Sequence, residues 1–268
     1  MLRSGIRGRL VAVAITAGAV TAALLPTGPA SAAPASFTKI QGAASNAAGL
    51  QETVDLYRTL LGAPDNGSLP GTQPAGRREI NWDGVPDTFS APNQLPRDFF
   101  NTTAPRGVVF SGATSFQVSA DSANPAAAPV RFGNLNSTYP SQFGTFSPER
   151  LFTPVGTNKT TIQFFVPGTT TRAAVKGFGA VFTDVDKAST TRIDVYDRWG
   201  AVLWGEWVPA GPTAAKSLSF LGVKTDADIY EVRITTGNAA LNSWTNDTAS
   251  TDVVVLDDFL YGEPKVIA

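Results

Sequence analysis

Two pairs of aspartates stand in apolar surroundings in this sequence. Asp184 and Asp186 follow an apolar run and lie two residues apart, so on an extended chain they point to the same side. Asp257 and Asp258 are adjacent within an apolar segment near the C-terminus. A carboxylate in such surroundings is costly to desolvate unless it is paired or bound to a metal ion. Calcium accepts about six to eight oxygen ligands without a fixed motif, so we predict a structural calcium ion at these four aspartates.

Other partners would also satisfy these carboxylates. An aspartate at the end of a strand can accept hydrogen bonds from backbone N–H groups, and Lys187 and Arg192 follow the first pair closely in the sequence. The sequence lacks the spaced aspartate loop of an EF-hand. Spacing alone therefore leaves the calcium site and the hydrogen-bonded or ion-paired alternatives open.

Two of the five tryptophans fall in segments that we expect to be loops. Trp199 lies in Asp197-Arg198-Trp199-Gly200, which is typical of a hairpin turn, and Trp244 lies in a polar stretch. An exposed indole offers a flat apolar face on which a sugar ring can stack. We therefore predict that Trp199 and Trp244 bind a ligand, most plausibly a polysaccharide, while packing under loops is the alternative.

The chain of 268 residues contains neither histidine nor cysteine. This composition excludes histidine-dependent catalytic triads, thiol nucleophiles, disulfide bonds and zinc sites built on imidazole or thiolate. Carboxylates remain available for a glycosidase or a polysaccharide lyase, which need suitably spaced acid and base groups. Because the sequence gives no separation between such groups, we favour a non-catalytic binding protein.

The elements that must position these residues are mostly short strands. Segments rich in β-branched and aromatic residues, with alternating polarity, are separated by Gly, Pro, Asn and Asp. Strands without intervening helices indicate antiparallel sheets that stack, so we predict an all-β antiparallel sandwich of the jelly-roll type. The predicted strands are 107–110, 115–119, 130–132, 160–166, 174–185, 191–196, 201–208, 217–223, 229–235 and 252–261.

One amphipathic helix is predicted over 46–61, ahead of these strands. Leu50, Val54, Tyr57 and Leu61 recur at the spacing of one helical face, and Gly62 follows as a terminator. We expect this face to pack on a sheet. Residues 46–268 are then one β-sandwich domain that includes the helix, and a flexible segment over 33–45 precedes it.

Residues 1–32 are typical of a secretory signal peptide. Arginines at positions 3, 7 and 9 precede an uncharged stretch over 10–25, and Ala30-Ser31-Ala32 supplies the small residues that a signal peptidase accepts. The apolar stretch is shorter than the roughly 20 residues that span a bilayer. We predict cleavage after Ala32, secretion, and no membrane attachment afterwards. The formal net charge of −1 offers no basic face for nucleic acid.

Five segments of the chain form a distinctive combination: 76–86, 177–186, 219–223, 233–238 and 256–264. Together they resemble a group of secreted bacterial proteins similar to the exported portions of PEP-CTERM surface proteins. The resemblance covers nearly all of the chain after residue 46, and it implies a jelly-roll-like sandwich akin to carbohydrate-binding modules. It also implies that the terminal Asp257-Asp258 strand lies near a structural calcium. Because the chain has no Pro-Glu-Pro anchor, we expect free secretion.

These features predict a secreted, non-catalytic protein that binds an extracellular glycan and carries structural calcium. A carbohydrate-active enzyme that uses carboxylates is the first alternative. A structural protein that self-associates through sheet edges is the second. The sequence leaves the oligomeric state open.

Overall fold

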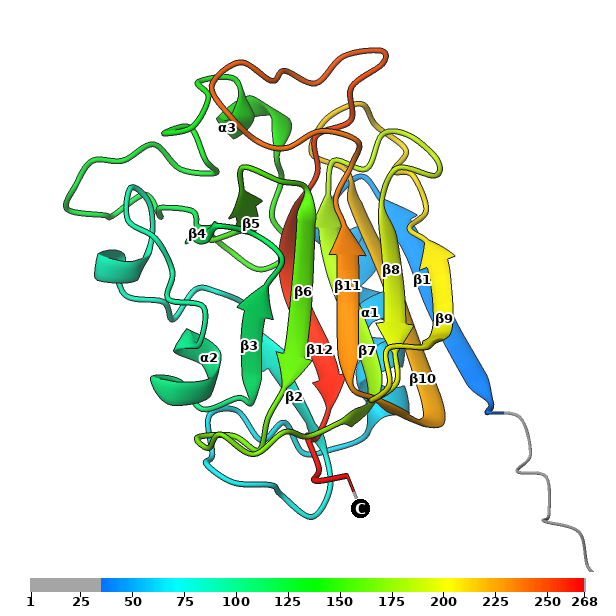
Figure 1. Ribbon diagram of the computed structural model, residues 1–268. Helices are drawn as coiled ribbons and strands as arrows, with labels where there is room; N and C mark the ends of the chain where they lie inside the picture. The colour runs from blue at the N-terminus through cyan, green and yellow to red at the C-terminus, as the bar shows by residue number, and fades with distance from the viewer. Residues whose placement is uncertain (1–34, 268) are drawn as a thin grey trace, which may run out of the picture. The chain divides into compact units, whose positions relative to one another are not determined.

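Two antiparallel β-sheets form the framework of the computed structural model, which describes residues 35–267 (Figure 1). The first sheet has the order β1-β10-β7-β12-β5-β4, and β2 also pairs with β12. The second sheet has the order β3-β6-β11-β8-β9. The all-β antiparallel sandwich predicted from the sequence is confirmed.

The strands of the first sheet are β1 (Phe37–Ala44), β2 (Arg77–Ile80), β4 (Ser115–Val118), β5 (Phe152–Val155), β7 (Val175–Thr183), β10 (Leu218–Ile229) and β12 (Val255–Gly262). Those of the second are β3 (Val108–Ser111), β6 (Lys159–Phe164), β8 (Arg192–Tyr196), β9 (Val202–Trp207) and β11 (Glu231–Thr235). Short helices interrupt the loops: α2 (Phe99–Thr102), α3 (Tyr139–Gln142) and the 3-10 turn η1 (Asp87–Phe89).

The two sheets differ in how many of their faces are buried. In β6 and β11 every second residue is buried, because one face of the second sheet packs on the core and the other meets solvent. Every residue of β12 is buried, since it lies inside the first sheet with the core on one side and covering segments on the other. Polar residues within β12 therefore need partners inside the protein.

Helix α1 (Ala47–Leu61) covers part of the outer face of the first sheet. Asn46 caps it by accepting a hydrogen bond from Gly49 N, and Gly62 ends it, as the sequence predicted. The ring of Tyr57 packs so closely on the sheet that a Cβ added at Gly179 or Gly222 would lie 2.7–2.8 Å from it. Glycine at these strand positions is what lets the helix approach the sheet.

One predicted strand is absent from the described residues, and two short strands of the first sheet were not predicted. Residues 130–132 are no strand, because Arg131 and Phe132 have positive φ values of 50° and 64° and Val130 makes only an isolated bridge. The strands β2 and β5 were not predicted, and both are only four residues long. β2 contains a single apolar residue and β5 contains a proline, so neither shows the alternating apolar pattern that made the equally short β3 and β4 recognisable.

The segment predicted to be flexible, 33–45, contains a strand. From Phe37 to Ala44, β1 pairs with β10 along its whole length as an edge of the first sheet. Its side chains are mostly exposed or half-buried, so the backbone hydrogen bonds rather than an apolar pattern hold it. The predicted signal peptide, 1–32, lies outside the described residues.

Among the residues that the structure describes, no helix is long and apolar enough to span a membrane.

A buried ion pair joins the C-terminal end of β12 to the loops beside it. Arg78 is fully buried and binds Glu263 through two parallel hydrogen bonds, 2.9 Å from Nε to Oε2 and 2.8 Å from Nη2 to Oε1. The remaining guanidinium hydrogens are donated to the carbonyl oxygens of residues 67, 69, 71 and 105. One side chain therefore fixes two loops that have no regular structure of their own.

We predict that Arg78→Met lowers the free energy of unfolding by about 3–5 kcal/mol, because it leaves the buried carboxylate of Glu263 uncompensated. Urea unfolding measures the loss. The matched control is Arg233→Met, which breaks a more exposed pair with Glu231 and should cost less than about 1 kcal/mol. Equal losses in the two variants would contradict this role of Arg78.

Candidate functional site

Two loops that follow long strands meet at one end of the sandwich. Asp184 and Asp186 come directly after β7, and Asp247 belongs to the loop between β11 and β12. Because Thr183 at the end of β7 pairs with Val255 at the start of β12, the two loops emerge side by side. Figure 1 shows the β11–β12 loop and α3 at this same end.

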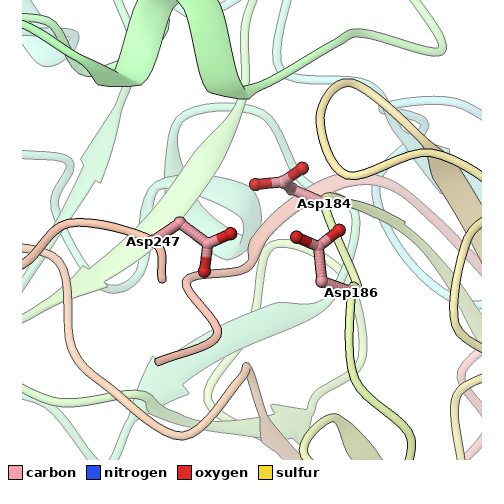
Figure 2. A group of neighbouring side chains, drawn as sticks. All are labelled: Asp184, Asp186 and Asp247. Atoms are coloured by element: carbon pink, nitrogen blue, oxygen red, sulfur yellow. The ribbon is translucent and has the colours of Figure 1, made fainter. Parts of the chain in front are cut away.

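Three carboxylates converge between these loops. One oxygen each of Asp184, Asp186 and Asp247 lies within 4.8 Å of the others, and Figure 2 shows the carboxylates facing one another. Asp184 is completely buried, and its backbone has a φ of 72°, which is uncommon outside glycine. This backbone turn directs the chain out of β7 and into the loop that carries Asp186. The three carboxylates can hold a metal ion.

The hydrogen bonds of this cluster are incomplete. Gln142 Nε2 donates to Asp184 Oδ2, and Val253 N donates to Asp247 Oδ1 at 3.3 Å. Asp184 Oδ1 and Asp186 Oδ1 are buried oxygens to which no described residue donates a hydrogen bond. A buried acceptor without a donor carries an unfavourable desolvation free energy.

The pKa values of Asp184 and Asp186 are raised by burial and by the neighbouring carboxylates. Burial raises the pKa of Asp184 to about 8, with further repulsion from Asp186, Asp247 and Asp252, while the hydrogen bond from Gln142 opposes the rise. Burial raises the pKa of Asp186 to about 7, and its contact with Asp247 adds to the rise. Both carboxylates thus resist ionisation unless a positive charge joins them.

The cluster borders an open cavity of about 630 Å³. Its walls are formed by Asp186, Asp247 and Gln142 together with Lys187 and the β9–β10 loop 211–214. Lys187 Nζ donates to Thr251 O at 3.2 Å, so this ammonium group is held by a backbone carbonyl. An ion and its water ligands therefore have access to the carboxylates from solvent.

The four aspartates predicted to hold one calcium ion do not converge. Asp257 and Asp258 lie within β12, in a bulge between Leu256 and Phe259, and not at the strand end where Asp184 lies. Residue spacing along the chain did not reveal this difference, because it does not tell which segments lie beside Asp257 and Asp258 in the fold. The prediction is corrected: only Asp184 and Asp186 belong to the candidate site.

Asp257 and Asp258 have partners of their own. Asp257 accepts hydrogen bonds from Phe146 N at 2.6 Å and from Ser147 Oγ at 3.1 Å. Asp258 accepts from Ser147 Oγ at 2.7 Å and lies 3.7 Å from Arg58 Nη2. Burial and the neighbouring carboxylate raise the pKa of Asp257, and burial raises the pKa of Asp258 to about 6. The hydrogen-bonded alternative is what the structure shows for this pair.

The two predicted ligand-binding tryptophans are both exposed, but they lie far apart. Trp199 is 81% exposed and Trp244 is 90% exposed. Trp199 follows β8 and Trp244 follows β11, and these strands pair antiparallel with Thr235 opposite Arg192. The two indoles therefore lie at opposite ends of the second sheet and cannot share one ligand site. Trp244 is at the same end as the aspartate cluster.

Sequence reasoning missed two residues of the site, Asp247 and Gln142. Asp247 stands in a polar loop, where an aspartate is usually solvated. Gln142 is one of many uncharged polar residues in a long connection. Only the meeting of the two loops in three dimensions distinguishes these residues.

We predict that the cation-free protein loses stability between about pH 5 and about pH 8. The folded-state pKa values of Asp258, Asp186 and Asp184 are raised to about 6, 7 and 8, so the folded protein retains protons that the unfolded chain releases. The free energy of unfolding must then fall as pH rises through this window.

Urea unfolding at several pH values in a chelator measures this slope. The slope should become shallower in Asp184→Asn, which has no titrating group at that position. Carboxylates with lowered pKa values, such as Glu79, titrate below the window and do not interfere. A free energy of unfolding that stays level or increases from pH 5 to pH 8 would contradict these protonation states.

Comparisons with known proteins give no assignment for this site. No protein-family model, curated protein or solved structure matches the chain. The function must therefore be inferred from the fold and from the chemistry of the described residues.

Proposed function

We propose that this protein is a secreted, non-catalytic binding protein that holds calcium at Asp184, Asp186 and Asp247 and binds an extracellular glycan through Trp244. The observation that carries the proposal is a pair of buried carboxylate oxygens, one on Asp184 and one on Asp186, that lie close to the carboxylate of Asp247. Neither oxygen accepts a hydrogen bond from any described residue. Export would bring the chain to surroundings where calcium is abundant.

The donor atoms of the cluster favour calcium over other metal ions. They are carboxylate oxygens, which hard cations prefer, and the chain contains no histidine or cysteine for softer metals. Calcium also tolerates irregular geometry and takes up about six to eight oxygens, so water from the open cavity can complete its coordination. A divalent charge would offset the burial and the carboxylate repulsion that together raise the pKa values of Asp184 and Asp186.

The glycan proposal depends on Trp244 and on the loop that presents it. Asn242 Oδ1 accepts hydrogen bonds from the backbone N–H groups of Trp244 and Thr245 at 2.8 and 3.0 Å, which shapes the turn at the loop tip. Tyr139 Oη of α3 donates to Thr245 O at 2.8 Å. Asp247 lies three residues beyond Trp244 in the same loop. A cation bound to Asp247 would therefore hold the loop on the C-terminal side of the indole, as Tyr139 holds it near the tip.

Calcium is expected to raise the melting temperature, because a ligand that binds only the folded state at a hundred times its dissociation constant adds about 2.7 kcal/mol. Asp186→Asn should abolish this rise and should itself increase the melting temperature in a chelator, since it removes carboxylate repulsion. Calorimetric titration and thermal unfolding measure the two effects.

The matched control is Asp228→Asn, which removes a surface carboxylate paired with Lys176 and should keep the calcium effect. A wild-type melting curve that is the same in calcium and in chelator would remove the calcium proposal.

For the glycan, we predict that Trp244→Ala reduces retention on a bound polysaccharide by about tenfold or more, as loss of an aromatic anchor does. Trp199→Ala should bind like the wild type, because Trp199 lies at the other end of the sheet. Pull-down on a panel of insoluble polysaccharides, with calcium and with chelator, measures retention.

Equal retention of the wild type and Trp244→Ala on every polysaccharide would disprove the glycan proposal. Release of reducing ends or of unsaturated uronates from the same panel would instead indicate a carbohydrate-active enzyme.

A further inference from the structure

The side-chain amide nitrogen of Gln142 lies among three acceptor oxygens at the candidate calcium site. Its Nε2 atom is within hydrogen-bond distance of three oxygens: Asp184 Oδ2, Asp247 Oδ2 at 3.2 Å and Ala214 O at 3.2 Å. An amide nitrogen carries only two hydrogens, so it cannot donate fully to all three acceptors. Without a cation, this amide is the side-chain hydrogen-bond donor that the described residues offer to the carboxylates of both Asp184 and Asp247.

The backbone around Gln142 is fixed while its amide can turn. Gln142 O accepts a hydrogen bond from Lys216 N at 2.8 Å, and Phe143 N at the end of α3 donates to Tyr139 O at 3.0 Å. The last torsion of a glutamine side chain is broad and roughly two-fold, so a half-turn exchanges Oε1 and Nε2 at little cost. The same position can therefore present either a donor or an acceptor to the cluster.

We propose that Gln142 is a ligand of the cation through Oε1 and that its amide turns when the cation binds, an inference that rests on the proposed calcium site. In the cation-free protein the NH₂ group faces the carboxylates and offsets part of their repulsion. In the bound protein Oε1 occupies that place and faces the cation. When no cation is bound, the NH₂ group thus provides part of the electrostatic stabilisation that the cation would provide.

Three acceptor oxygens surround the position that is exchanged. An oxygen in the place of Nε2 would lie 3.2 Å from both Asp247 Oδ2 and Ala214 O, and closer still to Asp184 Oδ2. Neighbouring ligand oxygens around calcium, at metal–oxygen distances of about 2.3–2.6 Å, are themselves separated by about 3 Å. Oε1 in this place is repelled by the surrounding oxygens unless a cation lies among them, so the proposed site includes Ala214 O as a ligand together with Oε1.

The resulting site draws on four separate segments of the chain. Asp184 and Asp186 come from the end of β7, Asp247 from the β11–β12 loop, Ala214 from the β9–β10 loop and Gln142 from α3. Five protein oxygens and a few waters complete the coordination of calcium. Magnesium requires a tighter octahedron and keeps its own water, so it matches this dispersed set less well.

A different role for Gln142 predicts the opposite result. If its NH₂ group only screens the carboxylates, the cation must displace it, and removing the amide would tighten calcium binding. If Oε1 is a ligand, removing the amide weakens binding. The sign of the change in affinity therefore separates the two roles.

The test is calorimetric titration of calcium into wild type, Gln142→Met and Gln142→Glu near pH 8. We expect Gln142→Met to weaken calcium binding by about tenfold or more, and Gln142→Glu to bind at least as tightly as the wild type because it keeps an oxygen in place. Gln51→Met is the matched control, since Gln51 Nε2 also donates to a carboxylate, that of Asp55, but on the surface of α1. It should leave calcium affinity unchanged.

A second measurement uses the wild type alone and so does not depend on how the variants fold. The NH₂ resonances of the Gln142 side chain in ¹⁵N-labelled protein should shift on adding calcium, because Nε2 leaves the carboxylates. Calcium binding with unshifted resonances, or with unchanged or higher affinity in Gln142→Met, would overturn this role of Gln142 but leave the calcium site intact. Failure of the wild type to bind calcium would instead refute the proposed function itself.

Discussion

Carboxylates that are buried in a sandwich must be neutralised by groups within reach, and this constraint shapes both acidic clusters of the protein. At β12, Ser147, Phe146 N and Arg58 supply donors and positive charge to Asp257 and Asp258. At the end of β7 the described residues supply far less, so buried oxygens of Asp184 and Asp186 have no donor. The carboxylates of the first cluster thus have partners within the protein, whereas the second leaves buried oxygens to which no described residue donates.

The position of the second cluster follows from the architecture. The central strands β7 and β12 are buried on both faces, so polar groups are tolerated only where these strands end or bulge. Antiparallel pairing places the end of β7 beside the start of β12, and the loop that enters β12 carries Asp247. The pairing of β7 with β12 thus also brings carboxylates from distant parts of the chain together.

Most of the framework could be predicted from the sequence, because alternation in strands such as β6 and β11 directly reflects one buried and one exposed face. The helix was predictable from its apolar face and its terminator, Gly62. The strand β1 was not, since backbone hydrogen bonds hold it and its side chains carry little pattern. The site was predicted in part: Asp184 and Asp186 stood out by their apolar surroundings. Asp247 and Gln142 lie in polar loops, where only tertiary contacts give them a role.

The β11–β12 loop connects the two halves of the proposed function. On one side it is held by neutral hydrogen bonds to α3 and to the segment before α3, from Tyr139 Oη to Thr245 O and from Asn136 Nδ2 to Asn246 Oδ1 at 3.0 Å. On the other side Asp247 faces two carboxylates that repel it. The closeness of three carboxylates therefore makes the attachment of the loop weaker on this side than on the other. A cation between the carboxylates changes that repulsion into attraction, and the loop that carries Trp244 is then held on both sides.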